Sequence, residues 1–271
     1  MPERIAFIGG GNMASAILGG LIQQGVSPGQ IDVIEPAEPA REQLRSKFGL
    51  APKGDAGPFL DQAALVIWAV KPQVFKQATV AVAPYTGQAL HLSVAAGIPS
   101  ASIAHWLGSE RVVRSMPNTP ALIGQGITGL FARTGVTQAD RSRVEEVLAT
   151  TGEFVWFERE DLLDAVTALS GSGPAYVFYF LEAMTEAGRQ MGLTPEQAYR
   201  LALQTFRGAS ALAQSSGEPP QILRQRVTSK GGTTDAAISM MDGQQLKGMF
   251  IQALHAAYQR AGQLGKEFGQ Q

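Results

Sequence analysis

The chain has 271 residues, 45% of them hydrophobic, which is enough for one large domain or two ordinary ones with a full core. The net charge is −1 at pH 7 and no segment is strongly basic, which argues against nucleic acid or an anionic membrane as a partner. Without cysteine, and without an apolar run of about 18 residues, we expect no disulfide, thiolate metal site, signal peptide or membrane span, as in a cytoplasmic protein.

The chain begins with a predicted strand, a glycine turn and a helix. Residues 4–8 are typical of a buried strand, and from Met13 apolar residues recur at helical spacing, with Asn12 as the expected cap. Gly9, Gly11 and Ala14 form the pattern G-x-G-x-x-A. In this context it predicts a dinucleotide site, with the pyrophosphate on the N–H groups of the helix N-terminus. The alternative is a turn that only connects strand to helix.

Strands and helices alternate up to about residue 160, which predicts an α/β fold with a parallel sheet. We expect further strands at residues 31–34, 63–70, 90–94, 111–115, 126–132 and 154–157, and helices at 39–48, 74–82, 100–107 and 137–149. Together with the glycine turn, this pattern predicts an N-terminal Rossmann domain over residues 1–160.

Several residues follow the predicted strands, where a doubly wound sheet binds its ligands. Glu35 follows the second strand, where a carboxylate accepts hydrogen bonds from the adenosine 2′-hydroxyl and repels a 2′-phosphate, so it favours NADH over NADPH. Residues 69–72 lie at the end of the central strand, and the proline-rich loop 116–120 is expected over the same crevice. The alternatives are an exposed loop glutamate for Glu35 and a solvated strand-end lysine for Lys71.

From about residue 160 only helices are predicted, so residues 161–271 form a second, all-α domain. The expected helices cover residues 162–169, 175–191, 195–215 and 220–226, a segment ending at 241, and 244–268. Pro174 predicts a kink, and Thr194 with Gln197 predicts a capping box. The helix faces carry more apolar residues than such a bundle buries alone, which predicts a homodimer or larger assembly.

Two small-residue motifs of the helical half are candidate binding elements. In residues 169–176, Ser170 and Ser172 offer hydroxyl donors where small residues admit a planar group; the alternative is a proline kink at a helix contact. In residues 227–234, Gly231 and Gly232 precede a helix start, so free N–H groups and hydroxyls would bind a carboxylate. The alternative there is an ordinary helix cap.

Nothing in the sequence predicts a metal site or a paired-carboxylate catalyst. His91, His105 and His255 are scattered, and each is expected to be a packed or surface histidine. A reaction in which a cofactor carries the difficult step and the protein positions the reactants fits this pattern.

Six stretches together resemble the pyrroline-5-carboxylate reductase family and span nearly the whole chain in the family's order. They are FIGGGNMA at 7–14, AVKP at 69–72, SVAAG at 93–97, RSMPNTP at 114–120, DAVTALSGSGPAY at 164–176 and VTSKGGTT at 227–234. Two positions vary from the common pattern: Lys230, where many members carry proline, and Glu35, where many carry a small polar residue and favour NADPH.

The resemblance implies a Rossmann domain followed by an all-α dimerisation domain, NADPH or NADH as coenzyme, and an interlocked homodimer, which in several members forms a ring of five dimers. It implies dinucleotide contacts from Ile8, Gly9, Gly10, Gly11, Asn12, Met13, Glu35, Ala69, Val70, Lys71, Pro72, Ala95, Ala96 and Gly97. It also implies substrate contacts from Ser229, Gly231, Gly232, Thr233 and Thr234, with the partner subunit completing each site.

The implied reaction reduces a cyclic imine that bears a carboxylate to proline, the last step of proline biosynthesis. We expect the N–H groups of residues 231–233 and Ser229 to bind the carboxylate, and the Thr234 hydroxyl to hydrogen-bond the ring nitrogen as the catalytic residue. Ser172 and Pro174 are expected beside the nicotinamide.

Two other functions remain open at this point. A β-hydroxyacid dehydrogenase shares the two-domain plan but usually needs a lysine on the interdomain helix, and residues 162–191 contain none. A non-catalytic NAD(P) sensor would not need the residues of the 229–234 loop, and any proline-forming turnover would exclude it.

Overall fold

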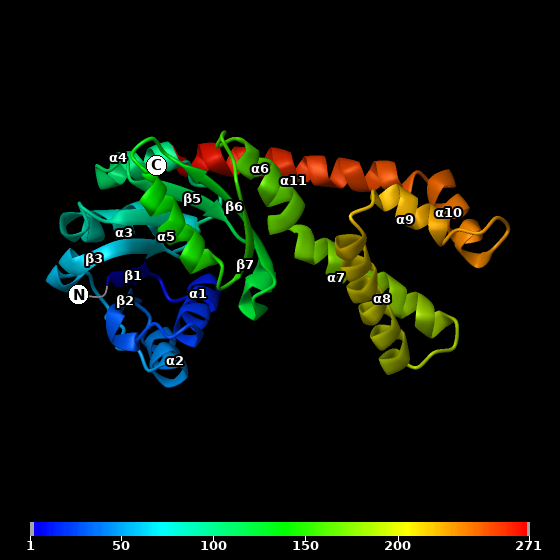
Figure 1. The fold of residues 1–271 in the computed structure, drawn as a ribbon, viewed down its shortest axis with the longest axis horizontal. Helices are drawn as coiled ribbons and strands as arrows, with labels where there is room; N and C mark the ends of the chain where they lie inside the picture. Colours follow the sequence, from blue (N-terminus) through cyan, green and yellow to red (C-terminus); the bar gives the residue numbers. More distant parts are fainter. Residues whose placement is uncertain (1–2, 270–271) are drawn as a thin grey trace. The chain divides into compact units, whose positions relative to one another are not determined.

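The computed structural model describes residues 3–269, so the outer limits of the two predicted domains, residues 1 and 271, lie outside the described residues. The strands are β1 (Arg4–Ile8), β2 (Ile31–Ile34), β3 (Ala63–Trp68), β4 (Leu90–Ser93), β5 (Val112–Met116), β6 (Gly126–Ala132) and β7 (Gly152–Trp156). The helices of the first half are α1 (Asn12–Gln23), α2 (Glu38–Phe48), α3 (Pro72–Val82), α4 (Ser100–Leu107) and α5 (Gln138–Leu148) (Figure 1).

The strands form one sheet in the order β2-β1-β3-β4-β5-β6-β7, parallel from β2 to β5. β6 runs antiparallel to β5 and β7 runs parallel to β6. The strand order reverses beside β1, where Ile8 pairs with Ile34 on one side and Trp68 on the other. The carboxyl ends of β1, β2 and β3 therefore meet at one point of the sheet edge, which is where doubly wound folds bind their ligands.

The sheet is covered on both faces, which confirms the α/β fold class. One core cluster packs α1, α2 and α5 against the sheet through residues such as Ile17, Leu44 and Val147. The second packs α3 and α4 against the other face through Phe75, with Ile103 from α4. Because apolar side chains cover both faces, the central strands are continuous apolar runs.

Most element boundaries agree with the prediction, and the differences have local causes. β3 ends at Trp68 instead of residue 70, because the chain turns there toward Pro72, the first residue of α3. Asn12 does not cap α1: Gly11 holds the N-cap position without a side-chain hydrogen bond, so the expectation for Asn12 was wrong. The N–H groups at this helix end therefore remain available.

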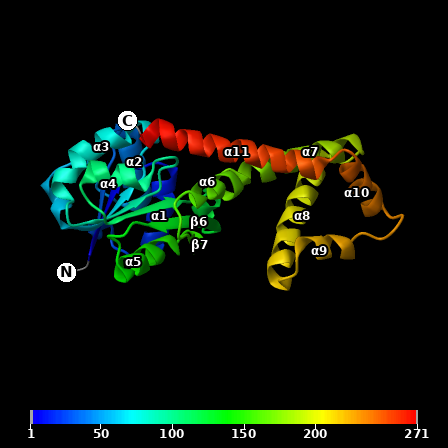
Figure 2. The ribbon, with the colours of Figure 1, turned by 90° about the horizontal axis from the view of Figure 1, so that it is seen from above.

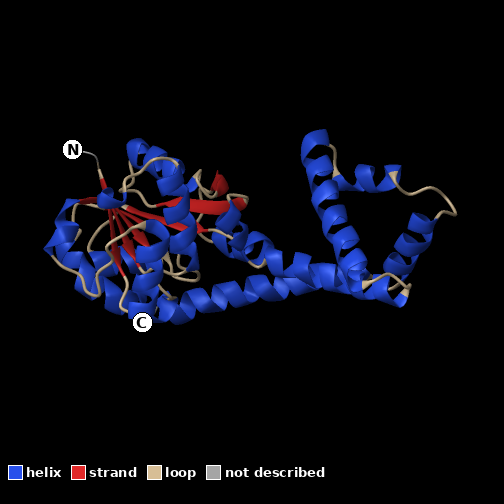
Figure 3. Ribbon diagram, turned by 90° about the horizontal axis from the view of Figure 1, so that it is seen from below, coloured by secondary structure: helices blue, strands red, loops and turns tan. Residues whose placement is uncertain are grey.

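All described elements after β7 are helical (Figure 3). They are α6 (Leu162–Val166), a π-helical turn (Thr167–Gly171), α7 (Gly173–Gln190), α8 (Pro195–Ser216), α9 (Pro220–Arg226), α10 (Thr233–Gly243) and α11 (Leu246–Gly269). Thr194 and Gln197 form the predicted capping box of α8. None of the described helices is long and apolar enough to cross a membrane.

The chain divides into two compact units. One comprises the residues up to Ser172 together with those from Ala257 onward, and the other is Gly173–Ala256. In the first unit Glu160 accepts hydrogen bonds from the Ser100 backbone N–H and hydroxyl (both 2.6 Å) and from Arg114 Nη1 (2.9 Å), which fixes the approach to α6 against the sheet.

The second unit is a set of helices with a small hydrophobic core. α7 and α8 pack against each other (Figure 2), and Phe180 and Phe250 make an edge-on ring contact at 5.7 Å. Leu181, Ala198 and Ala202 are the buried hydrophobic residues of this unit in the described chain. Many of its large apolar side chains remain exposed, among them Phe178, Tyr179 and Leu201.

Candidate functional site

The glycine turn joins three strand ends. Gly9 has φ +96°, a conformation that favours glycine, and its N–H donates to the Ile34 carbonyl at 2.8 Å. A Cβ on Gly9 would lie 2.6 Å from the Ala69 carbonyl oxygen, so this position also allows the close approach of β3. Gly9 therefore has the tight-turn role that the motif predicts.

Gly11 faces open space at the N-terminus of α1. No protein atom lies within 4 Å of a Cβ built on it, and it lines a cleft of about 560 Å³. Because the helix has no side-chain cap, its first N–H groups and positive dipole end are free for an anion. This opening fits the pyrophosphate of a dinucleotide.

The cleft lies at the carboxyl ends of β1, β2 and β3. The predicted cofactor residues in its wall are Ile8, Gly9, Gly11, Glu35, Ala69, Val70 and Lys71. The remaining wall comes from Ile34, the loops 36–37 and 54–56, and the α3 residues Val74, Gln77, Ala78, Ala81 and Val82. Gly10, Asn12, Met13 and Pro72 adjoin these residues in the chain without belonging to the wall.

The predicted turn Ala95–Gly97 lies outside this wall. It follows β4, and Ala95 is buried whereas Ala96 is exposed. Gly97 has φ +75°, and a Cβ there would lie 3.2 Å from Leu264 Cβ of α11. Close packing of α11 accounts for the glycine, and the cofactor contacts of these three residues remain a prediction.

The Glu35 carboxylate is fixed by the backbone on both sides. Its Oε2 accepts the Gly10 N–H and its Oε1 accepts the Ala37 N–H, each at 2.9 Å. Glu35 is therefore no freely solvated loop side chain: it links the end of β2 to the glycine turn and presents its charge to the cleft.

A group of charged residues on α2 continues from Glu35 and was not singled out from the sequence. Arg41 Nη1 donates to the carbonyls of Glu35 (2.7 Å) and Pro36 (2.6 Å), and Nη2 pairs with Glu38. Arg45 bonds Glu38 at 2.7 Å, and both arginines hold the pKa of Glu38 below its usual range. The i, i+3 and i, i+7 spacing on the helix was the available signal.

The candidate substrate loop lies in the second unit, at the start of α10. The Gly232 N–H donates to the Ser229 carbonyl at 2.9 Å, and the Gly231 N–H, with Gly231 at φ +74°, donates to Asp235 Oδ2 at 2.8 Å. As first residues of the helix, Thr233 and Thr234 present N–H groups that no carbonyl of α10 can accept. Of the three N–H groups predicted to bind the carboxylate, those of Gly231 and Gly232 are bonded within the loop, and that of Thr233 lies at the helix end.

The motif at residues 169–176 overlaps a π-helical turn, which precedes α7. The Ser172 N–H reaches the Thr167 carbonyl at 2.9 Å, and Pro174 lies in the first turn of α7. Asn118 donates from Nδ2 to the Ser170 carbonyl at 3.2 Å and accepts the Ile127 N–H on Oδ1 at 3.0 Å. This side chain joins the 116–120 loop to the turn, and π-helical turns are frequent at functional sites.

Of the three histidines, one is buried and two are exposed. His91 is buried and accepts the Trp68 indole N–H on Nδ1 at 3.2 Å, and burial lowers its pKa to about 4, so it is neutral near pH 7. His105 and His255 are exposed. Among residues 3–269 no cluster of His, Asp or Glu could hold a metal ion.

Comparison with known protein families matches both halves of the chain. Residues 160–264 match the model for pyrroline-5-carboxylate reductase dimerisation. Residues 4–97 match the model for NADP oxidoreductase, coenzyme F420-dependent, a region that contains the whole cleft wall.

Curated relatives match over nearly their full length. A pyrroline-5-carboxylate reductase of Pseudomonas aeruginosa is 45% identical over 98% of both chains. Pyrroline-5-carboxylate reductase 2 of Bacillus subtilis is 34% identical over 98% of this chain and 96% of its own.

Solved structures match in the same way. A pyrroline-5-carboxylate reductase of Coxiella burnetii superposes with a TM-score of 0.89 at 38% identity, covering 97% of this chain and 99% of its own. A Plasmodium falciparum pyrroline carboxylate reductase with NADP bound gives 0.87 at 26% identity, covering 97% and 98%.

Proposed function

The chain belongs to the pyrroline-5-carboxylate reductase family, and we propose that it works through the cleft beside β1 and the loop at the start of α10. It is an NAD(P)H-dependent oxidoreductase that reduces 1-pyrroline-5-carboxylate to proline. The observation that carries this conclusion is 45% identity over 98% of both chains. The proposed setting is the last step of proline biosynthesis in the cytoplasm.

In this proposal the cleft holds the coenzyme. Gly9 and Gly11 open the turn to the pyrophosphate, the start of α1 supplies N–H donors, and Glu35 faces the adenosine ribose. Gly10, Asn12, Met13, Ala69, Val70, Lys71, Pro72 and the turn Ala95–Gly97 complete the proposed contacts. The reduced nicotinamide supplies the hydride that the imine carbon accepts.

The substrate loop has two proposed tasks. The first is to hold the carboxylate through the Thr233 N–H and the Ser229 hydroxyl, while Gly231 and Gly232 shape the turn with their own N–H groups bonded inside it. The second is to hydrogen-bond the ring nitrogen through the Thr234 hydroxyl, which orients the imine and relays to the nitrogen a proton supplied by solvent as the carbon accepts hydride. Ser172 and Pro174 are proposed to lie beside the nicotinamide.

The helical unit is proposed to form a homodimer. Five such dimers are proposed to form the ring that the resemblance implies. A family model named for dimerisation matches residues 160–264, and this part of the chain has exposed apolar helix faces. The partner subunit then completes each active site.

Changing Thr234 tests the catalytic assignment. Thr234→Ala is expected to lower kcat by about 10- to 100-fold, because the imine loses its hydroxyl partner, whereas Thr234→Ser keeps a hydroxyl and most of the activity. Steady-state rates with both coenzymes would measure this. Thr205→Ala, which removes a hydroxyl bonded within α8, is the matched control. Unchanged kcat in Thr234→Ala would refute the role of Thr234.

A further inference from the structure

One end of the coenzyme cleft, the end where Glu35 would face the adenosine ribose, is acidic; we call it the ribose end. Glu35 lines it with both carboxylate oxygens held by the N–H groups of Gly10 and Ala37, so the charge cannot turn away. Asp55 also lies in the wall and is exposed. Each Glu35 oxygen keeps a lone pair for a ribose hydroxyl, whereas a phosphate group there would meet a fixed negative charge.

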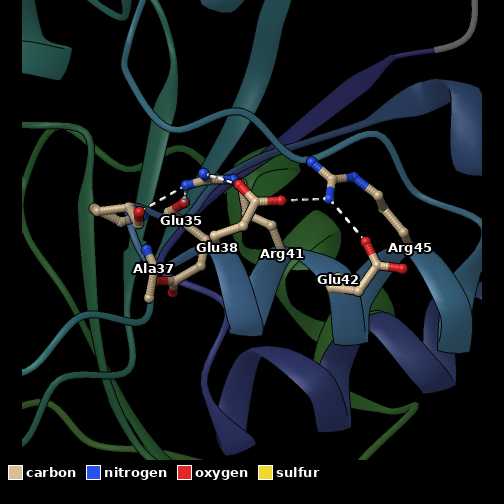
Figure 4. A network of polar contacts seen from close by, with 7 residues as sticks. Glu35, Ala37, Glu38, Arg41, Glu42 and Arg45 are labelled. Carbon is tan, nitrogen blue, oxygen red and sulfur yellow. Dashed lines mark hydrogen bonds and ion pairs between the residues drawn. The ribbon is translucent and has the colours of Figure 1, made fainter.

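Arg41 lies beside the ribose end, and its guanidinium is bonded within the protein. Arg41 Nη1 donates to the Glu35 and Pro36 carbonyls, and Nη2 pairs with Glu38 (Figure 4). Its side chain is only 16% exposed, and it does not belong to the cleft wall. A positive charge thus lies directly under the loop that forms the ribose end, but a carboxylate neutralises it.

Glu38 holds two arginines at once. Its Oε2 pairs with Arg41, and its Oε1 accepts Arg45 Nη1 at 2.7 Å. Glu42 accepts only Arg45, at 3.0 Å. Of these two glutamates, Glu38 is therefore the one whose charge determines whether Arg41 is available to a ligand.

The neighbouring lysine is engaged elsewhere. Lys53 lies over the Phe59 ring, with Nζ 3.2 Å from its centroid, and 4.0 Å from Asp32 Oδ1. Lys71 is the cation of the cleft wall, and it follows β3, away from the β2 end that carries Glu35. None of these residues therefore provides an unpaired cation for a 2′-phosphate at the ribose end.

We infer that Glu38 is a second coenzyme-specificity residue: by neutralising Arg41, which donates to the Glu35 carbonyl, it makes the cleft select a dinucleotide with a free 2′-hydroxyl. The inference rests on the proposed use of this cleft for the coenzyme. Removing the Glu38 charge leaves Arg41 in place, bound to two carbonyls, but with an uncompensated positive charge beside the ribose end.

Binding of coenzyme fragments tests this without catalysis. Calorimetry with adenosine diphosphoribose and with its 2′-phosphate would be carried out on the intact chain and on Glu38→Gln, with Glu42→Gln as the matched control on the same helix. We expect the unmodified chain to bind the form without phosphate at least about 10-fold more tightly. Glu38→Gln should strengthen binding of the 2′-phosphate form about 5-fold or more, and Glu42→Gln by less than about 2-fold.

The outcomes separate the two claims. If neither fragment binds the intact chain, the assignment of the cleft is wrong. If adenosine diphosphoribose binds but Glu38→Gln leaves the ratio of the two affinities unchanged, or Glu42→Gln changes it equally, the role of Glu38 is refuted and the cleft assignment stands. Unchanged melting temperatures of both variants would show that each remains folded.

Discussion

At the scale of single residues, Gly9 and Gly11 are two positions apart and differ in what a side chain would meet. Gly9 has φ +96°, and a Cβ there would lie 2.6 Å from a carbonyl oxygen of the neighbouring turn, whereas a Cβ on Gly11 would meet no protein atom within 4 Å. One glycine thus serves the fold and the other leaves room for a ligand.

This contrast predicts opposite consequences for two alanine substitutions. Gly9→Ala should lower the free energy of unfolding by about 2 kcal/mol or more, because it combines strained backbone with overlap. Gly11→Ala should change it by less than about 1 kcal/mol, yet weaken binding of adenosine diphosphoribose about 10-fold, because the methyl group occupies the pyrophosphate's space. Urea denaturation and calorimetry measure the two quantities; a Gly11→Ala protein with unchanged affinity would contradict this account.

The sequence was sufficient for the glycine turn, because the motif, the strand before it and the helix after it are all local. It also placed Glu35 correctly at the end of β2. It could not predict that the carboxylate bonds the Gly10 N–H, 25 residues away, since that contact depends on the packing of β2 beside β1. The Gly231 N–H was likewise expected to be free and is bonded to Asp235.

At the scale of elements, residues 169–176 show where reasoning from neighbouring residues is insufficient to predict the local structure. Pro174 lacks an N–H, so the carbonyl of Ser170, four residues earlier, would lose its helix partner. The predicted consequence was a kink. The structure has a π-helical turn there, and Asn118 from a loop distant in sequence donates to that carbonyl. Only the tertiary fold brings Asn118 within reach, so the sequence indicated the interruption but not its form.

The exposed face of α7 is the part of the helical unit that we expect at the dimer interface. Phe178 is 58% exposed, and with Leu181 and Tyr199 it lines a second cavity between α7 and α8. An aromatic side chain in such a position is a typical anchor of a subunit interface.

Phe178→Glu should therefore weaken the dimer. Loss of a buried aromatic anchor costs about 2 kcal/mol or more, so the dissociation constant should rise about 30-fold. Light scattering across a dilution series would measure the molar mass of both proteins. The mass of the variant should fall toward that of a monomer at a higher protein concentration than the mass of the unchanged chain. Val80→Glu, at a 73% exposed position on α3, is the control and should leave the mass unchanged. A monomeric unchanged chain at micromolar concentration would contradict the proposal.

At the scale of the whole molecule, the two halves differ in how much of their fold the sequence predicts. The first is stabilised by a core on both faces of a sheet, and the alternation of strands and helices predicted its fold class but not its strand order or the antiparallel β6. The second has few buried residues of its own, so the spacing of its apolar residues predicted the helices but not how they pack. The domain boundary expected at residue 160 lies in the segment that Glu160 fixes to the sheet through Ser100 and Arg114.

The most direct test of the account is the reaction itself. Purified protein would be given 1-pyrroline-5-carboxylate with NADH or NADPH, with coenzyme oxidation followed optically and proline quantified. We expect one proline for each coenzyme oxidised, and a higher kcat/KM with NADH because of Glu35 and Glu38. No oxidation with either coenzyme, from folded protein that still binds adenosine diphosphoribose, would contradict the assigned reaction.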